Sequence, residues 1–249
     1  MRGTLGELRA TLANRALLVL FATGVFLAMA TGLSAALNVY FNTYFWELTS
    51  NQISVIVLSN FVSAAVAFVV APVLSVRLGK KQAAMRVALA AVVIGPGPIV
   101  LRLAGLFPEN HSPVLLPMLL AASTTFVTLF IVTSILISAM VADVAEESEV
   151  VTGRRSEGLL FAANSFVQKT VSGVGIFVSS LLLGAIGFPR GARPGEVDPV
   201  VVRALGLMYA PLLVLLYLVG IGFLSRYRIS RASHEATLET LAGRTSRRA

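Results

Sequence analysis

The sequence predicts an all-α integral membrane protein that crosses the bilayer six times. Three observations carry this prediction: the composition, six long apolar runs, and the distribution of Lys and Arg between those runs. Of the 249 residues, 56% are hydrophobic and 13% are charged, and the mean hydropathy is +0.84. A water-soluble globular domain is typically ~45–50% apolar and ~25% charged. A membrane interior is therefore the environment that this composition fits.

The six apolar runs set the expected helices. Each run exceeds the ~20 residues that an α-helix needs to cross ~30 Å of hydrocarbon, and the longer ones are expected to tilt or to project into water. Residues 1–14 are expected to form a cytoplasmic lead and residues 226–249 a basic cytoplasmic tail. No cleavable signal is expected, because the first run is about 30 residues long and leads into further membrane sequence. The expected helices cover residues 15–45, 53–76, 83–104, 114–142, 159–188 and 201–225.

Lys and Arg are unevenly divided between the two sets of segments that flank the runs. The set that includes both ends of the chain carries 15 of them and the other set carries four, with Lys169 inside a helix. The positive-inside rule therefore places both termini in the cytoplasm. The first set contains Arg2, Arg9, Arg15, Arg77, Lys80, Lys81, Arg86, Arg154, Arg155, Arg226, Arg228, Arg231, Arg244, Arg247 and Arg248, and the second contains Arg102, Arg190, Arg193 and Arg203.

Several function classes are disfavoured by the residues at hand. The chain has no Cys, and its two His, His111 and His234, lie far apart in polar segments, so no thiolate or His-based metal site is expected. The net charge of +8 is scattered between apolar runs and forms no basic face for nucleic acid. An intramembrane enzyme built on Glu146 and Glu149, one helical turn apart, would lack a nucleophile and base beside them. Neither enzymatic activity nor a nucleic-acid partner is therefore expected.

Polar side chains gather on one face of the helix expected at 159–188. At 100° per residue, its polar residues fall within an arc of about 140°, with apolar residues on the rest of the helix. Polar residues also step by three or four along the helices expected at 15–45 and 114–142, so three helices are expected to share a polar cavity. The alternative is that the Ser and Thr hydroxyls bond carbonyls of their own helix or help the helices to pack. The principal polar residues of this expected cavity are Asn164, Gln168, Lys169, Ser172, Asn38, Asn42 and Tyr40.

Lys169 is the sharpest of these features. An ammonium near the bilayer centre costs roughly 2.5–3.5 kcal/mol, and Lys169 lies about ten residues, or about 15 Å, inside the start of its expected helix. The alternative is a lysine that reaches back to the interface, but this distance is long for one side chain. None of the six expected spans contains Asp or Glu. The counter-charge of Lys169 is therefore expected from a solute or from another chain.

The charged stretch at 142–158 and the membrane lysine together carry a family resemblance. They follow the pattern A-D-V-x-(D/E)-x-x-E-x-x-x-G-x-R-x-E-G, continued by Gln168 and Lys169. This pattern resembles the C-terminal half of the glycoside–pentoside–hexuronide:cation symporters, the melibiose permease group of the major facilitator superfamily. Two positions depart from the family pattern: Ile137, where a Pro is common, and Glu147, where an aromatic is common. Three further segments resemble the same half, namely Asn14-Arg15, Leu78-Gly79-Lys80-Lys81 and Ile186-Gly187-Phe188.

The resemblance implies that the six helices correspond to helices seven to twelve of a twelve-helix transporter. The family's membrane lysine falls on Lys169, so the polar face around it becomes the expected site for a solute and a coupling cation, sodium or a proton. The cation is bound mainly by the N-terminal half, which this chain lacks, and no other cofactor is implied. The family's cytoplasmic gate falls on Asp143, Glu146, Glu149, Arg155 and Glu157.

The expected function is that of the C-terminal half of a secondary active transporter in the cell's inner (plasma) membrane. It would carry a sugar or another small polar solute with a cation by alternating access. The expected partners are the lipid bilayer, the small polar solute and an N-terminal six-helix half, either a separate chain or a missing part. Two alternatives remain: a non-transporting remnant or regulatory half, and a lipid or lysolipid carrier of the same superfamily. The sequence Gly95-Pro96-Gly97-Pro98 in the third run is expected to form a kink.

Overall fold

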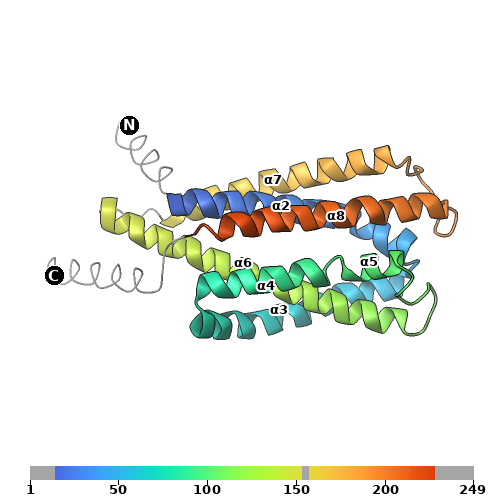
Figure 1. Ribbon diagram of the computed structural model, residues 1–249, viewed down its shortest axis with the longest axis horizontal. Coiled ribbons are helices and arrows are strands. Elements are labelled where there is room, and N and C mark those ends of the chain that lie inside the picture. Colours follow the sequence, from blue (N-terminus) through green and yellow to red (C-terminus); the bar gives the residue numbers. More distant parts are fainter. Residues whose placement is uncertain (1–14, 153–156, 228–249) are drawn as a thin grey trace.

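The computed structural model describes residues 15–152 and 157–227, and the elements of these ranges are all helices. The helices lie side by side in one elongated bundle (Figure 1). Six helical segments in this part of the chain are long and apolar enough to cross a membrane. They are Arg15–Phe45, Ser50–Leu78, Lys80–Leu103, Leu115–Glu147, Ser165–Ala185 and Pro199–Leu224. The predicted all-α fold with six spanning helices is confirmed.

The elements follow one another along the chain with short connections. They are α2 (Arg15–Tyr40), which continues into a π-helical turn η1 (Phe41–Phe45), α3 (Ser50–Leu78), α4 (Lys80–Ile94), α5 (Gly97–Leu103), α6 (Leu115–Thr152), α7 (Glu157–Ala185) and α8 (Pro199–Leu224). Thr49 and Gln52 form a capping box that starts α3. Asp198 caps α8 by accepting a hydrogen bond from the backbone N–H of Val200 at 2.8 Å. These caps satisfy backbone donors that the first turn of a helix leaves free.

The first and last described residues lie at the same end of the bundle (Figure 1). We call this the terminal end, and it also carries the turn at Gly79 and the end of α6. The opposite end, which we call the loop end, carries the connections at 46–49, 104–114 and 186–198. Each end of the bundle has its own cluster of buried apolar side chains. Leu17, Leu136, Met140 and Tyr227 belong to the cluster of the terminal end, and Leu37, Phe41, Trp46 and Tyr209 belong to that of the loop end.

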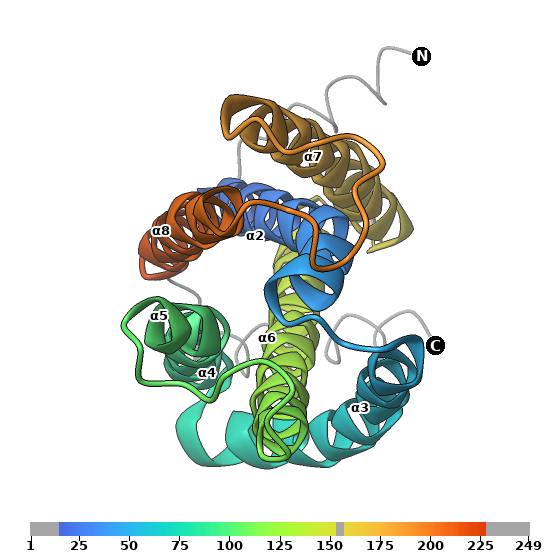
Figure 2. The ribbon, with the colours of Figure 1, turned by 90° about the vertical axis from the view of Figure 1, so that its right-hand side faces the viewer.

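The helices form two sets of three. In one set α2 packs against α7 and α8, and in the other α6 packs against α3 and α4. Fewer contacts join the sets, chiefly from α4 and α5 to α8 and from α2 to α6. Figure 2 shows α2 and α6 between the two outlying helices α7 and α3, with α8, α4 and α5 grouped on one side of the bundle. We call α7 and α3 the edge helices.

The contact between α2 and α7 is a contact of backbones. A Cβ atom added at Gly32 would lie 2.0 Å from the carbonyl oxygen of Ser172, and one added at Gly175 would lie 2.3 Å from the carbonyl oxygen of Met29. Both distances are far shorter than any packing distance, so only glycine fits at these two positions. Small residues allow this close approach between membrane helices, where dispersion contacts take over from the hydrophobic effect. This crossing fixes the level of α7 relative to α2.

The third span is broken in the way expected from its sequence. Helix α4 ends at Ile94, a turn follows at Gly95 and Pro96, and α5 continues the span to Leu103. A Cβ atom at Gly95 would lie 2.6 Å from the ring of Phe126 on α6. The glycine therefore makes room for an aromatic ring of the neighbouring helix, and the break acts as a kink in the packing of α4 and α5.

The acidic stretch at the end of the fourth span differs from the expectation. The fourth expected helix ends at residue 142, but α6 runs on to Thr152. Asp143, Glu146 and Glu149 therefore lie on the last turns of one continuous helix. The physical reason is that no Gly or Pro occurs between Met118 and Gly153, whereas Ala, Glu and Met support a helix. Figure 1 shows this end of α6 reaching beyond the neighbouring ends of α3 and α4.

Candidate functional site

Lys169 lies on an exposed flank of α7. Taken at 100° per residue, it is about 120° around the helix from Gly175, the residue that touches α2. Its side chain is exposed, and within the described residues its ammonium makes no ion pair or hydrogen bond. The backbone carbonyl of Lys169 accepts a hydrogen bond from the hydroxyl of Ser172 at 2.9 Å. The charge therefore points away from the backbone contact between α7 and α2.

Two neighbours of Lys169 on α7 were expected to share its face. Gln168 is half-buried and lies within about 20° of the Gly175 direction, so it is turned toward α2 rather than along the flank. Asn164 belongs to α7, but its side chain lies outside the described residues. The flank of Lys169 is thus shared with Ser172 more closely than with Gln168.

The polar residues of α2 lie near the loop end. Asn42 is 8% exposed, and its side-chain Nδ2 donates to Oδ1 of Asn38 at 2.9 Å. Asn42 sits in the π-helical turn η1, and such turns are frequent at functional sites. Asn38 is exposed. The exposed amide of Asn38 can therefore meet a ligand, while the buried amide of Asn42 holds the Asn38 side chain in place.

Tyr40 belongs to an aromatic cluster rather than to this amide pair. Its ring lies 5.1 Å from that of Phe188 and 6.0 Å from that of Tyr44, measured between centroids. The hydroxyl of Tyr44 donates to the carbonyl of Ala192 at 2.9 Å. Tyr40 therefore helps to join η1 to the segment after α7 at the loop end.

The structure places the lysine and the amide pair at different levels. Gly32 contacts Ser172, so these two residues mark the same height on α2 and α7. Lys169 is three residues toward the terminal end from this height and Asn38 is six residues toward the loop end. At 1.5 Å per residue the two side chains start about 14 Å apart along the bundle axis. The expected site is therefore divided into a lysine zone and an amide zone.

Most hydroxyls in the spans bond to their own helix. Thr133 donates to the carbonyl of Leu129 at 2.9 Å and Ser134 to that of Phe130 at 3.0 Å. This is the alternative that the sequence left open, a hydroxyl bonded to the carbonyl four residues earlier. The same arrangement holds for Thr23, Thr31, Thr125 and Thr128. These hydroxyls are therefore already satisfied within the helix.

A charge cluster lies at the terminal end, where the gate was expected. Asp143 of α6 is 7% exposed and forms an ion pair with Lys80 at the start of α4. Lys81 donates to the carbonyl of Ser225, just after α8, at 2.7 Å. The cluster thus connects the first turn of α4 to both α6 and the end of α8.

Tyr227 completes this cluster. It is 2% exposed, and its hydroxyl donates to the carbonyl of Met140 at 3.4 Å. Burial raises the pKa of Tyr227 well above its usual value, and the negative charges of Asp143 and Glu147 raise it further. The neutral phenol therefore persists beside the acidic end of α6.

The other expected gate residues are only partly visible. Glu146 and Glu149 are half-buried on the last turns of α6. Arg155 lies outside the described residues, as does the side chain of Glu157, whose backbone begins α7. Lys80 and Tyr227 were not among the expected site residues. The Leu78-Gly79-Lys80-Lys81 segment was the signal that could have pointed to Lys80, whereas nothing in the sequence around Tyr227 marks it as buried.

These features define a class: a polytopic membrane protein of two three-helix sets, with an exposed lysine on the spanning helix α7 that has no ion pair within the described chain. A comparison with known families makes the assignment specific, because the family described as MFS/sugar transport protein matches residues 2–231. The chain therefore belongs to this family of the major facilitator superfamily, and the predicted relationship is confirmed. The family is one of transport proteins, which also confirms the expectation that the chain is not an enzyme.

Two relatives have been named as symporters. The uncharacterized symporter YjmB of Bacillus subtilis is 26% identical over 234 residues, which cover 92% of this chain and 47% of the relative. The uncharacterized symporter sll1374 of Synechocystis is 30% identical over 249 residues, which cover 96% of this chain and 43% of the relative. The chain thus spans a little less than half the length of the curated relatives that it matches.

Proposed function

We propose that this chain is the C-terminal half of a secondary active transporter that moves a small polar solute together with a cation by alternating access. Such a transporter binds its solute between two six-helix halves that rock about the site. The names of the two relatives, both symporters, support coupling to a cation. The observation that carries the proposal is the charge of Lys169, which lies inside the span Ser165–Ala185 and has no ionic partner among the described residues.

The edge helices support a companion half. In the most apolar 18-residue stretch of each span, 11% of the residues are buried in α3 and 17% in α7. The corresponding share is 33–44% in the other four spans. Both helices therefore present broad faces that something outside the described chain must cover. A six-helix N-terminal half seated against α3 and α7 would cover them and would enclose the flank of Lys169. Lipid would cover the remaining apolar surface.

The roles of the two zones follow from their chemistry. The ammonium of Lys169 can donate three hydrogen bonds to solute hydroxyls or pair with a carboxylate of the companion half. The Asn38–Asn42 pair offers amide donors and acceptors at a second level. With Ser172 beside the lysine, a solute would meet the lysine zone and the amide zone in turn as it crosses.

By the positive-inside rule, the terminal end faces the cytoplasm. The membrane of this proposal is the plasma membrane of the cell. The cluster of Lys80 and Asp143 then stands at the inner gate, with Glu146 and Glu149 on the last turns of α6 and Glu157 at the start of α7. Arg155 lies between these two helices in the sequence. We place the contacts of this gate with the companion half on these residues. In an outward-open state they would hold the inner ends of the helices together.

Replacement of the membrane lysine tests the proposal. With this chain and its companion half expressed together, Lys169→Ala is expected to abolish solute accumulation driven by the ion gradient while insertion in the membrane stays normal. Lys169→Arg is expected to restore it only in part, because a planar guanidinium replaces a compact ammonium. The measurement is uptake of labelled solute into cells or vesicles, alongside the amount of inserted protein.

Thr170→Ala is the matched control, since Thr170 is the exposed neighbour on α7 and lies about 100° further around the helix. It should leave accumulation unchanged. Undiminished accumulation by the Lys169→Ala variant would contradict the proposal. Failure of every combination to transport, in spite of a stable complex of the two halves, would favour the regulatory alternative.

A further inference from the structure

A cavity of about 380 Å³ opens at the loop end of the bundle, remote from the level of Lys169. It lies between η1, the end of α5 and the start of α8. Figure 2 shows α5 and α8 together on the side of the bundle away from α3. The cavity therefore lies on the side of the bundle away from α3, at the level of the loop-end connections. Its polar lining consists of Tyr44, Glu47, Arg102, Asn110, Arg203 and the backbone at Gly195.

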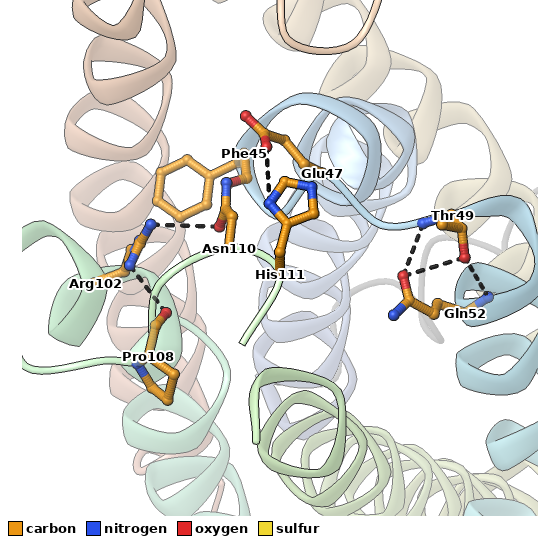
Figure 3. Close-up of polar contacts among 8 residues, drawn as sticks. All are labelled: Phe45, Glu47, Thr49, Gln52, Arg102, Pro108, Asn110 and His111. Atoms are coloured by element: carbon orange, nitrogen blue, oxygen red, sulfur yellow. Dashed lines mark hydrogen bonds and ion pairs between the residues drawn. The ribbon is translucent and has the colours of Figure 1, made fainter. Parts of the chain in front are cut away.

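Arg102 is held in this cavity by neutral groups. One guanidinium nitrogen, Nη1, donates to the carbonyl of Pro108 at 2.9 Å, and Nη2 donates to Oδ1 of Asn110 at 3.4 Å (Figure 3). Nη1 also donates to the carbonyl of Phe107 at 3.5 Å. Asn110 in turn donates from Nδ2 to the carbonyl of Phe45 at 3.2 Å. The side chain is thus fixed in place, but none of these acceptors neutralises its charge.

The second guanidinium is that of Arg203, near the start of α8. Its side chain is exposed and makes no hydrogen bond or ion pair with any described residue. The cavity also contains one carboxylate, that of Glu47. Its Oε2 lies 3.7 Å from Nδ1 of His111, and the carboxylate is turned toward that ring (Figure 3). Two guanidinium groups and one carboxylate therefore line the cavity, which leaves its lining with a net positive charge.

We propose that this cavity is a binding site for a phosphate-bearing anion. Two guanidinium groups are the chemistry that recognises phosphate, because each can donate two parallel hydrogen bonds to its oxygens. Arg102 is already positioned and Arg203 is free to close on the ligand. The phenol of Tyr44 and the amide of Asn110 border the same space and can contact neutral parts of the ligand.

The surroundings favour the head group of an anionic phospholipid as the source of that phosphate. Leu207 lies one turn after Arg203 on the same face of α8 and is 52% exposed. On α5, Val100 and Leu101 are 50% and 42% exposed. An acyl chain that descends from a head group in the cavity would therefore find apolar side chains directly below it. A free phosphate ion would use the same two guanidinium groups and nothing below them.

Lipid retention by the purified protein tests the site. The chain is reconstituted in nanodiscs with phosphatidylglycerol and phosphatidylcholine, and the lipids retained after extraction are counted by native mass spectrometry. The wild type is expected to keep one phosphatidylglycerol in preference to phosphatidylcholine. Arg203→Gln should weaken this retention on the order of fivefold, the worth of one Arg near a charged membrane surface, and the loss should shrink at high salt.

Arg190→Gln is the matched control, because Arg190 is exposed at the same end of the bundle but does not line the cavity. It removes the same charge and should leave retention unchanged. Arg102→Lys is a second variant that keeps the charge and loses the planar fork, and it should weaken retention as well. Because Arg203 makes no hydrogen bond or ion pair within the described residues, its replacement tests binding without removing a polar contact of the fold.

A second arm separates the two sources of phosphate. Inorganic phosphate is titrated into the protein in a neutral detergent, and the melting temperature is followed. Selective retention of phosphatidylglycerol without a response to inorganic phosphate identifies a lipid site, and the reverse pattern identifies a site for the free anion. Equal losses in Arg203→Gln and Arg190→Gln, or no response in either arm, would overturn the proposal.

Discussion

The two edge helices, α7 and α3, are joined to the helices between them by different chemistry. Helix α7 meets α2 backbone to backbone at Gly32 and Gly175, where a single methyl group has no room. Helix α3 meets α6 through a hydroxyl, since Ser63 Oγ donates to the carbonyl of Thr124 at 3.1 Å. In return, Thr128 Oγ1 lies 3.4 Å from the carbonyl of Ser63. At the α2–α7 contact, an added methyl group would clash with backbone atoms. At the α3–α6 contact, the hydroxyl groups can be removed without a clash.

The largest expected effect is an added methyl group at the glycine contact. Gly175→Ala is expected to lower the free energy of unfolding by more than about 3 kcal/mol, because backbone atoms cannot turn aside as a side chain can. Gly173→Ala, two residues away on the same helix, is the control, since nothing lies within 4 Å of a Cβ atom there. This control should be neutral or stabilising by up to about 1 kcal/mol through helix propensity.

Unfolding in mixed micelles with increasing denaturing detergent measures both variants. Similar stabilities for Gly173→Ala and Gly175→Ala would contradict the idea that shape fixes this edge. A loss confined to Gly175→Ala would locate the constraint at the α2–α7 crossing.

The ion pair of α4 and α6 gives the second effect. Lys80→Ala is expected to cost about 1–3 kcal/mol of unfolding free energy, because Asp143 is buried and loses this ion pair. The lower part of this range applies if water reaches the site, since the Lys80 side chain is 31% exposed. Lys81→Ala is the control and should cost less, because Lys81 bonds only to a neutral carbonyl. Equal losses for the two lysines would mean that the pair with Asp143 adds nothing of its own.

The smallest effect is expected at the α3–α6 edge. Ser63→Ala removes one hydroxyl between the helices and should cost about 0.6 kcal/mol, the average for such bonds in membrane proteins. Ser59→Ala is the control, because the hydroxyl of Ser59 donates only to the carbonyl of Ile56 within its own helix, at 2.7 Å. A cost at Ser63 as large as that of Gly175→Ala would show that the two edges do not differ as described.

The six spans could be predicted because hydropathy and length depend on the chain alone, and the bilayer thickness sets the length. The glycine crossing could not, because Gly32 and Gly175 resemble the other glycines of the spans until α2 and α7 are brought together. The helical state of Asp143–Glu149 also differs from the prediction, because hydropathy ends the fourth expected helix at residue 142 although helix-forming residues continue to Thr152.

The candidate site was predictable in its charge but not in its geometry. Lys169 stands out in any reading of the sequence, because a charge inside an apolar span is rare. The level of Asn38 and Asn42 relative to Lys169 depends on how α2 and α7 are packed, and periodicity within one helix carries no such information. The pairing of Lys80 with Asp143 joins residues 63 positions apart, so it too required the fold.

The length of α6 has a mechanical consequence. Its 38 residues form a rod of about 57 Å, nearly twice the ~30 Å thickness of the hydrocarbon layer. A continuous helix acts as a lever, so a tilt of about 10° around its midpoint would swing its acidic tip sideways by about 5 Å, as its half-length dictates. A displacement of that size exceeds the length of an ion pair. Small rocking movements inside the bilayer are thereby amplified into the making and breaking of contacts in the water outside it.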